Sequence, residues 1–236
     1  MKTTKLAKTL VAAAAALLVA GQASATLVTV VRTAGYYDPT YGGGEFTLKG
    51  SPWANPAHYA LETLVDGGFQ TFCLEVNEFL SGQPLLAVLN TVAVMGGKGG
   101  GSPDPLSIGS AWLYKQFAEG NLAGYDYTPG AGREASARAL QETIWWLEDE
   151  QTSLPSDLTF YNLVIAKFGS AAAAKQDYTV VNPNYRVAVI NLWGKDDQGN
   201  WTVPKQDMLV YLPDGGVTLV LLGSGLVGLA VLRRKG

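Results

Sequence analysis

The sequence contains very little cysteine, histidine or charge. One cysteine, Cys73, and one histidine, His58, occur in 236 residues. A single cysteine excludes an intramolecular disulfide framework. Charged residues make up only 16% of the chain, and a net charge of -3 provides no concentrated basic surface of the kind that binds nucleic acid. We therefore expect no nucleic-acid partner, and the sequence predicts neither a cofactor nor a metal site.

Glycine and apolar residues are plentiful instead. The chain has 28 glycines, and 47% of its residues are hydrophobic, which is typical of a folded domain and not of a disordered chain. The patterns predict an α+β fold, an antiparallel β-sandwich or barrel with a helical insertion. Strands are expected near 26–32, 45–49, 69–76, 85–95, 184–193, 201–203 and 208–212, and helices near 107–121, 133–150 and 158–174.

The N-terminus has the pattern of a secretory signal peptide over residues 1–25. Three lysines precede an apolar run over residues 10–20, and small residues at positions 23 and 25 fit the cleavage rule. Cleavage is expected between Ala25 and Thr26. The apolar run is too short for an uncleaved membrane anchor. The sequence therefore predicts an exported domain over residues 26–211.

The C-terminal segment, residues 212–236, has a second targeting pattern. An apolar run over 217–232 is near the lower limit for a membrane span, and a basic cluster follows it. This cluster would stay cytoplasmic, with the domain outside. A plain membrane anchor is one interpretation. The alternative depends on the residues that precede the run, which are Pro213, Asp214, Gly215 and Gly216.

This tail resembles the sorting signals of the PEP-CTERM type, in particular their Val-Pro-Asp variants. Leu212 stands where the variant has valine, and no glutamate follows Pro213. The resemblance implies processing by an exosortase in a Gram-negative bacterium. An inner-membrane intermediate, held by the C-terminal segment, would precede delivery to the cell surface or extracellular matrix.

Cys73 lies in a predicted strand, Phe69–Val76. Side chains alternate between the two faces of a strand. Phe72 and Leu74 are therefore expected in the core, and Cys73 on the opposite face. A helix packed on that face would cover Cys73.

Gln141 lies in the helix predicted over residues 133–150. Apolar residues recur there at three-and-four spacing and form one buried stripe: Ala137, Leu140, Ile144 and Leu147. Gln141 follows Leu140 by about 100° of arc, and Trp145 lies one turn along on its own face. We therefore expect Gln141 at the shoulder of the stripe, partly shielded from solvent.

The segments Phe72-Cys73-Leu74 and Leu140-Gln141-Glu142-Thr143-Ile144-Trp145 resemble, in order, the two motifs of the thioester domains of bacterial surface proteins. The resemblance implies an internal thioester between Cys73 and Gln141, formed with loss of ammonia. Phe72 and Trp145 are expected to shield it from water. An amine or hydroxyl on a partner surface would attack the bond, so the resemblance implies a single-use covalent adhesin and not an enzyme.

Other interpretations remain open at this stage. Cys73 could be an ordinary buried residue of a structural surface or exopolysaccharide-matrix protein. A cysteine hydrolase would need His58 within hydrogen-bond reach of the sulfur. The glycine-rich segment 96–103 lacks the Lys-Ser/Thr ending of a phosphate loop, and segment 196–200 is predicted to be a hairpin turn and not a calcium loop.

Overall fold

A computed structural model describes residues 25–53, 56–94, 96–99, 101–178 and 185–212. Ala25 is exposed, and the first strand begins at Thr26, the first residue after the predicted cleavage point. The rest of the predicted signal peptide lies outside the described residues, as do the sorting motif and the apolar tail. Across the described ranges, no helix is both long and apolar enough to cross a membrane.

The fold is α+β with a mainly antiparallel sheet, as predicted at that level. The strands follow the sheet order β10-β8-β5-β1-β2-β4-β3, and β9 pairs with β8. Their bounds are β1 Thr26–Val31, β2 Phe46–Lys49, β3 Leu64–Val65, β4 Gly68–Thr71, β5 Leu85–Asn90, β8 Val187–Lys195, β9 Trp201–Pro204 and β10 Met208–Tyr211. Two short strands, β6 Val92–Ala93 and β7 Asp104–Pro105, pair with each other.

Strand β1 divides its pairing between two neighbours. Its first half pairs with β5, beginning at Thr26↔Ala87, and its second half pairs with β2, ending at Val31↔Thr47. Val28 and Val30 are buried whereas Leu27 is half exposed, which is the period-two alternation of a strand with one face on the core. β1 therefore links two parts of the sheet.

The segment that follows β4 bonds to β10, the strand at one end of the sheet order. The Leu209 amide donates to the Phe72 carbonyl at 3.2 Å, and the Leu74 amide donates to the Asp207 carbonyl at 3.1 Å. The Thr71 hydroxyl donates to the carbonyl of Leu209 at 2.6 Å. These bonds connect the segment after β4 to β10, so the backbone groups at this junction are satisfied.

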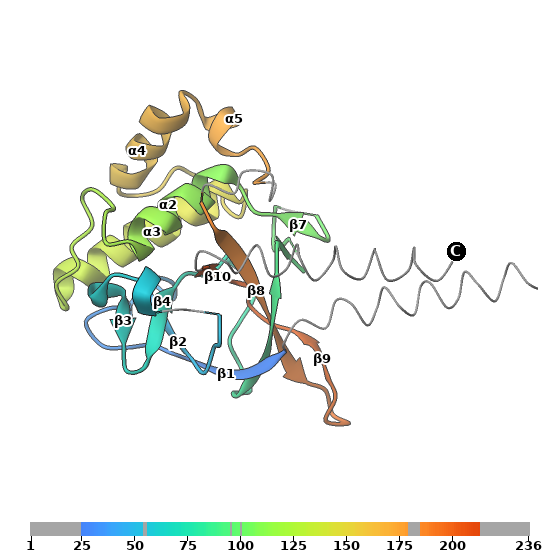
Figure 1. The fold of residues 1–236 in the computed structure, drawn as a ribbon. Helices are drawn as coiled ribbons and strands as arrows, with labels where there is room; N and C mark the ends of the chain where they lie inside the picture. Colours follow the sequence, from blue (N-terminus) through green and yellow to red (C-terminus); the bar gives the residue numbers. More distant parts are fainter. Residues whose placement is uncertain (1–24, 54–55, 95, 100, 179–184, 213–236) are drawn as a thin grey trace, which may run out of the picture.

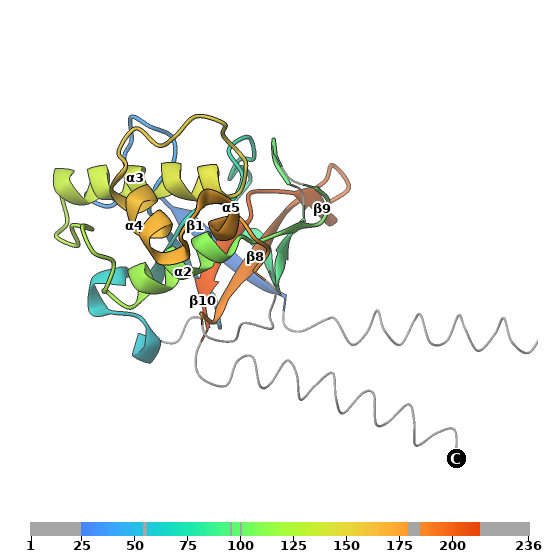
Figure 2. The same ribbon diagram turned by 90° about the horizontal axis from the view of Figure 1, so that it is seen from above.

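The helices form layers on the sheet (Figures 1 and 2). The α-helices are α2 Ile108–Ala118, α3 Ala131–Leu147, α4 Thr159–Phe168 and α5 Ala171–Ala174, and the short 3-10 helices are η1 Pro56–His58 and η2 Leu61–Thr63. Helices α2 and α3 lie next to the strands, and α4 and α5 lie outside them (Figure 1). Ser107 caps α2 by accepting a hydrogen bond from the Ser110 amide.

Several predicted boundaries were wrong. The helices predicted over 107–121 and 133–150 end earlier, at Ala118 and Leu147. The helix predicted over 158–174 is two helices, because Gly169 adopts a left-handed φ of 81° that ends α4. The strand predicted over 69–76 ends at Thr71, where pairing transfers to β10. The strand predicted over 184–193 begins at Val187 and continues to Lys195. The predicted hairpin turn at 196–200 is confirmed, with the Asp196 carboxylate accepting from the Gln198 and Asn200 amides.

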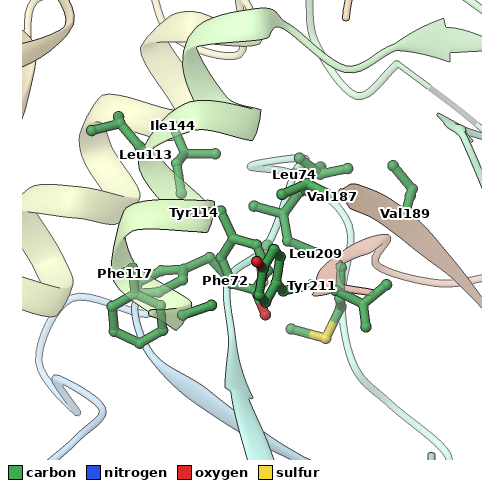
Figure 3. Packing of buried hydrophobic residues seen from close by; sticks show 14 of the residues in the cluster. Phe72, Leu74, Leu113, Tyr114, Phe117, Ile144, Val187, Val189, Leu209 and Tyr211 are labelled. Carbon is green, nitrogen blue, oxygen red and sulfur yellow. The ribbon is translucent and has the colours of Figure 1, made fainter. Parts of the chain in front are cut away.

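The core lies between the sheet and helices α2 and α3. Figure 3 shows Phe72 beside Tyr114 and Phe117 of α2, with Leu209 and Tyr211 of β10 close by. The rings of Phe72 and Phe117 are 5.0 Å apart and nearly perpendicular, an arrangement that aromatic pairs prefer. As predicted, Phe72 and Leu74 belong to this core, and Cys73, which was expected on the opposite face, is buried in the same cluster.

A buried ion pair fixes the N-terminal end of α3. The Arg133 guanidinium donates to both carboxylate oxygens of Glu45, at 2.8 and 2.6 Å, and both side chains are fully buried. The Tyr125 hydroxyl also donates to Glu45 at 2.6 Å, and Arg133 donates to the Glu62 carbonyl at 2.6 Å. The pair therefore joins α3 to the residue that precedes β2.

Substituting Arg133 should destabilise the fold strongly. Arg133→Ala leaves the Glu45 charge buried without its partner, so we expect a loss of about 3–5 kcal/mol in the free energy of unfolding, measured with urea. Arg138→Ala is the matched control on the same helix, because the Arg138 side chain is 42% exposed and its buried partner Glu142 still accepts a hydrogen bond from the Ser156 hydroxyl. It should cost about 1 kcal/mol or less. Equal losses for the two variants would contradict this account.

Candidate functional site

Cys73 lies at the junction between β4 and β10. It forms an isolated antiparallel bridge with Met208, the first residue of β10. Phe72 and Leu74, on either side of it, bond to the backbone of the β10 segment. Cys73 is 5% exposed and its thiol is free. The only cysteine of the chain is therefore held in a fixed and largely dry position.

The Gln141 side chain is hydrogen-bonded to the Cys73 backbone. Its carbonyl oxygen accepts from the Cys73 amide at 3.0 Å, and its NH₂ group donates to the Cys73 carbonyl at 2.8 Å. These two bonds connect residues 68 positions apart in the chain. The two residues of the predicted pair thus lie side by side, with the carboxamide carbon next to the backbone that carries the thiol.

Gln141 is more deeply buried than expected. The sequence pattern placed it on the shoulder of the apolar stripe, partly shielded, but it is 0% exposed. The stripe residues Ala137, Leu140, Ile144 and Leu147 are buried as predicted. The difference arises because a loop covers the helix face beside the stripe, an effect that helical periodicity does not report.

We call this loop, residues 37–44, the cover loop. The bridge between Tyr37 and Gly44 closes its base. A Cβ atom placed on Gly43 would lie 2.5 Å from Cη2 of Trp145 and 3.0 Å from Cγ of Gln141, so only glycine allows this approach. Tyr41 packs on Trp145 with ring centroids 5.8 Å apart.

The predicted shielding residues lie in different surroundings. Trp145 is 6% exposed and contacts the cover loop beside Gln141, and its buried indole N–H has no hydrogen-bond partner among the described residues. Phe72 is fully buried against α2 (Figure 3). Trp145 therefore covers the Gln141 side of the site, whereas Phe72 packs in the core next to Cys73.

The surroundings of Cys73 favour a neutral thiol. Burial raises the pKa of the thiol well above its ordinary value, Glu75 raises it further, and Arg32 opposes both effects. Arg32 is exposed and its guanidinium carbon lies 5.0 Å from the centre of the Tyr37 ring. A neutral, buried thiol is protected from oxidation and from unspecific chemistry.

An acidic cluster that sequence reasoning missed lies next to Cys73. The Glu75 carboxylate accepts hydrogen bonds from the Asp207 amide at 3.1 Å and from the Gln206 side chain at 3.2 Å. Within the part of the chain that the structure describes, one side-chain oxygen of each cluster member is buried without a partner; the members are Glu75, Glu78, Gln206 and Asp207. Residues from distant parts of the chain make up this cluster, so no local signal predicts it.

Burial and mutual repulsion favour the protonated forms of this cluster. Burial, then Asp207, then Glu78 raise the pKa of Glu75 well above its ordinary value. Burial raises the pKa of Asp207 to about 7, and burial followed by Glu150 raises that of Glu78 to about 7.

In the described part of the chain, no three histidine, cysteine or acidic residues are arranged to hold a metal ion.

Glu150 ties the segment after Cys73 to the end of α3. Its carboxylate accepts from the Val76 amide at 2.7 Å, the Lys98 amide at 2.7 Å and the Gly99 amide at 3.1 Å. The glycine-rich segment, predicted to be a flexible loop, is therefore anchored here. No signal in the sequence indicated this partner.

The structure does not bring His58 to the cysteine. His58 is the last residue of η1 and is half-buried, and among the described residues no hydrogen bond joins it to Cys73. A cysteine hydrolase needs a base within hydrogen-bond reach of the sulfur. This arrangement therefore gives no support to the hydrolase interpretation.

Enlarging Gly43 should open the site. In Gly43→Val the new side chain would collide with Trp145, so we expect the cover loop to move away and Cys73 to react faster. Methylamine treatment first yields a free thiol whether or not a thioester exists, and iodoacetamide labelling is then followed by mass spectrometry. We expect Cys73 in this variant to be labelled at least about tenfold faster than in the wild type. A tenfold increase corresponds to a free energy of local opening that is lower by about 1.4 kcal/mol.

Gly42→Asn is the matched control for the same loop. Nothing lies within 4 Å of a Cβ at Gly42, and its φ of 87° is left-handed, a region that asparagine tolerates. The labelling rate of this variant should match the wild type. Equal rates for all three proteins would show that the cover loop does not limit access to Cys73.

The acidic cluster should make the protein less stable as pH rises. Carboxyl groups in an unfolded chain have pKa values of about 4. In the folded protein, the pKa values of Asp207 and Glu78 are about 7. The folded state therefore binds more protons, and the free energy of unfolding falls as pH rises from about 4 through about 7. Asp207→Asn should reduce the loss between about pH 5 and pH 8 by roughly 1–3 kcal/mol, measured by urea unfolding.

The exposed Asp197→Asn is the control for this pH experiment. It removes the same charge from the hairpin turn, and the stability difference between the two pH values should stay as in the wild type. A steeper loss in Asp207→Asn than in the wild type would contradict the proposed repulsion.

Comparisons with models of protein families, with curated proteins and with solved structures find no match to this chain.

Proposed function

We propose that the protein is an exported surface protein in which Cys73 and Gln141 form an internal thioester that attaches it covalently to a partner. The partner group is an amine or a hydroxyl on a surface protein or polysaccharide. The observation that carries this proposal is the pair of hydrogen bonds between the Gln141 carboxamide and the Cys73 backbone, at 3.0 and 2.8 Å.

The surroundings of the pair support this chemistry. A thiol and an unactivated carboxamide react only when they are held together, and such confinement is worth about 10⁵–10⁸ M in effective concentration in well-oriented cases. Gln141 is fully buried and Cys73 is 5% exposed. Water, the competing nucleophile, is therefore largely kept from the bond.

The bond-forming step exchanges sulfur for nitrogen. The Cys73 sulfur adds to the Gln141 carboxamide carbon, the carbon–sulfur bond forms, and the carbon–nitrogen bond breaks. The thiol proton leaves with the nitrogen as ammonia. The product is a thioester, in which the Gln141 acyl group is already an electrophile. No cofactor and no separate catalytic base is needed to keep it in this activated form.

The attachment step releases the sulfur. A partner amine or hydroxyl adds to the same carbon, the carbon–sulfur bond breaks, and the sulfur takes up the proton that the nucleophile loses. The partner is then joined to Gln141 through an amide or an ester. The raised pKa of Cys73 makes its thiolate a reluctant leaving group, which favours a thioester that persists until a strong nucleophile arrives.

The route to the surface belongs to the same proposal. The predicted signal peptide over 1–25 exports the chain, and exosortase processes the tail at the motif that begins with Pro213. The finer fold proposed is a β-barrel, which the bonds between β10 and the Phe72–Leu74 segment support. An inner-membrane intermediate precedes release to the surface or matrix.

A structural role is the second candidate function. Both hydrogen-bonding groups of Gln141 are satisfied by the Cys73 backbone, which is what a side chain that only completes the β4–β10 junction would do. In that case the protein is a non-covalent surface or exopolysaccharide-matrix protein with a buried cysteine. The chemical state of Cys73 separates the two candidates.

The thioester should appear in the intact mass of the purified exported protein. We expect the wild type to lack the mass of one ammonia, and Cys73→Ala and Gln141→Ala to have their full calculated masses. Methylamine should add its own mass to the wild type by opening the bond. A wild type of full mass with one titratable thiol would exclude the covalent function and leave the structural one.

Gln151→Ala is a matched control at the end of the same helix. Gln151 donates to the Glu142 carbonyl at 3.0 Å, so the variant loses a glutamine and a hydrogen bond near α3 but leaves the Cys73–Gln141 pair intact. It should keep the mass deficit. A deficit lost equally in this variant would point to a general disturbance of α3.

A further inference from the structure

A groove on the outer face of the sheet has no part in the proposed thioester chemistry. Its volume is about 470 Å³, within the range of about 300–1,000 Å³ for small-molecule sites. Residues of β5, β8 and β9 line it, together with Val94. Leu86 pairs with Trp193, and Val88 with Asn191. Leu85 and Ala87 are fully buried, so strand alternation turns the other side chains of β5, including Leu86 and Val88, outward. Asn191 lines the groove but is itself buried.

Two tryptophans, Trp193 and Trp201, form the aromatic part of the groove. Both are half-buried. The Lys195 ammonium lies 4.9 Å from the centre of the Trp201 ring and helps to hold that ring in place. Across the described residues, neither indole N–H has a hydrogen-bond partner. A ligand in this groove therefore meets flat apolar rings that each carry a donor.

The polar side chains of the groove are fixed amides and a hydroxyl. Asn90 donates to the Asn191 side chain at 2.8 Å, and Asn191 donates to the Val92 carbonyl at 3.0 Å. The Thr202 hydroxyl donates to Asp196 at 2.8 Å, so its oxygen can still accept. None of the described residues that line the groove is ionisable.

These features select among ligand classes. A purely apolar occupant, including the apolar C-terminal segment of the chain, would bury two indole donors without partners, at a cost of about 1–3 kcal/mol each. A charged occupant would find no ionisable side chain among the described lining residues, and the Lys195 ammonium beside them packs on the Trp201 ring. A neutral carbohydrate has both apolar C–H faces to stack on indole rings and hydroxyl groups to accept from indole N–H and bond to the exposed Asn90 amide.

We propose that this groove binds a neutral polysaccharide chain, with sugar rings stacked on Trp193 and Trp201. β9, which carries Trp201, and α3, which carries Gln141, are at opposite sides of the molecule in both views (Figures 1 and 2). The other end of the groove lies nearer to the pair, because the Val94 amide donates to Asp207. Binding is reversible and needs no thioester. It would hold the protein on a polysaccharide surface independently of any covalent attachment.

Affinity electrophoresis of the purified exported protein tests the proposal. Native gels contain hydroxyethylcellulose, dextran or galactomannan, and a gel without polysaccharide is the reference. We expect at least one polysaccharide to retard the wild type. Trp193→Ala and Trp201→Ala should each weaken that interaction about tenfold or more, since buried aromatic anchors dominate binding, and Trp193→Phe should weaken it less.

Phe79→Ala is the control for a general effect of exposed aromatics. Phe79 is 73% exposed and does not line the groove, so its removal should leave retardation unchanged. Asn90→Ala changes an exposed position, so it tests the groove without removing a half-buried aromatic ring. This variant should bind the polysaccharide about threefold more weakly. Far-UV circular dichroism checks that each variant folds.

Several outcomes would overturn the carbohydrate site. One is no retardation by any of the three polysaccharides, and another is equal retardation of the wild type and both Trp→Ala variants. Binding of an apolar dye in the groove without any saccharide binding would assign it to an apolar partner. Cys73→Ala should be retarded like the wild type, and a loss in that variant alone would mean that retention is covalent and does not involve the groove.

Discussion

The hydrogen bonds between the Gln141 carboxamide and the Cys73 peptide connect the helical layer to the sheet at the point where β4 gives way to β10. At this point the regular strand has ended at Thr71, and a buried backbone group without a partner would be costly. Gln141 supplies both partners from a helix. The same contact that completes the sheet also brings a carboxamide beside the only thiol.

The other buried polar groups keep this contact in place. The Glu45–Arg133 pair fixes one end of α3, and Glu150, just beyond the other end, bonds to the Val76 amide shortly after Cys73. A helix fixed at both ends presents Gln141 in one orientation only. Preorganisation of this kind is what a reaction between two weakly reactive groups requires, and it equally suits a structural junction, so chemistry must separate the two.

The acidic cluster makes the stability of the same junction depend on pH. Glu75 and Asp207 are close to Cys73 and to its bridge partner Met208, and they stay together most easily when protonated. The β10 segment and the Cys73 segment are therefore joined by backbone bonds and pushed apart by charge as pH rises. The outer groove is lined by uncharged apolar, aromatic and amide side chains, and it reaches this cluster at one end, where the Val94 amide donates to Asp207 at 2.6 Å.

The sequence by itself determined the α+β class, most of the elements, the apolar stripe of α3 and the two motifs, because each depends on local periodicity or on a few adjacent residues. Only the tertiary structure decided that Gln141 meets the backbone of Cys73, that Gly43 of the cover loop closes over Trp145, and that Glu75 faces Asp207. It also placed Trp193 and Trp201 in one groove. These are contacts between residues far apart in the chain, and they depend on strand register and helix packing, which no local pattern specifies.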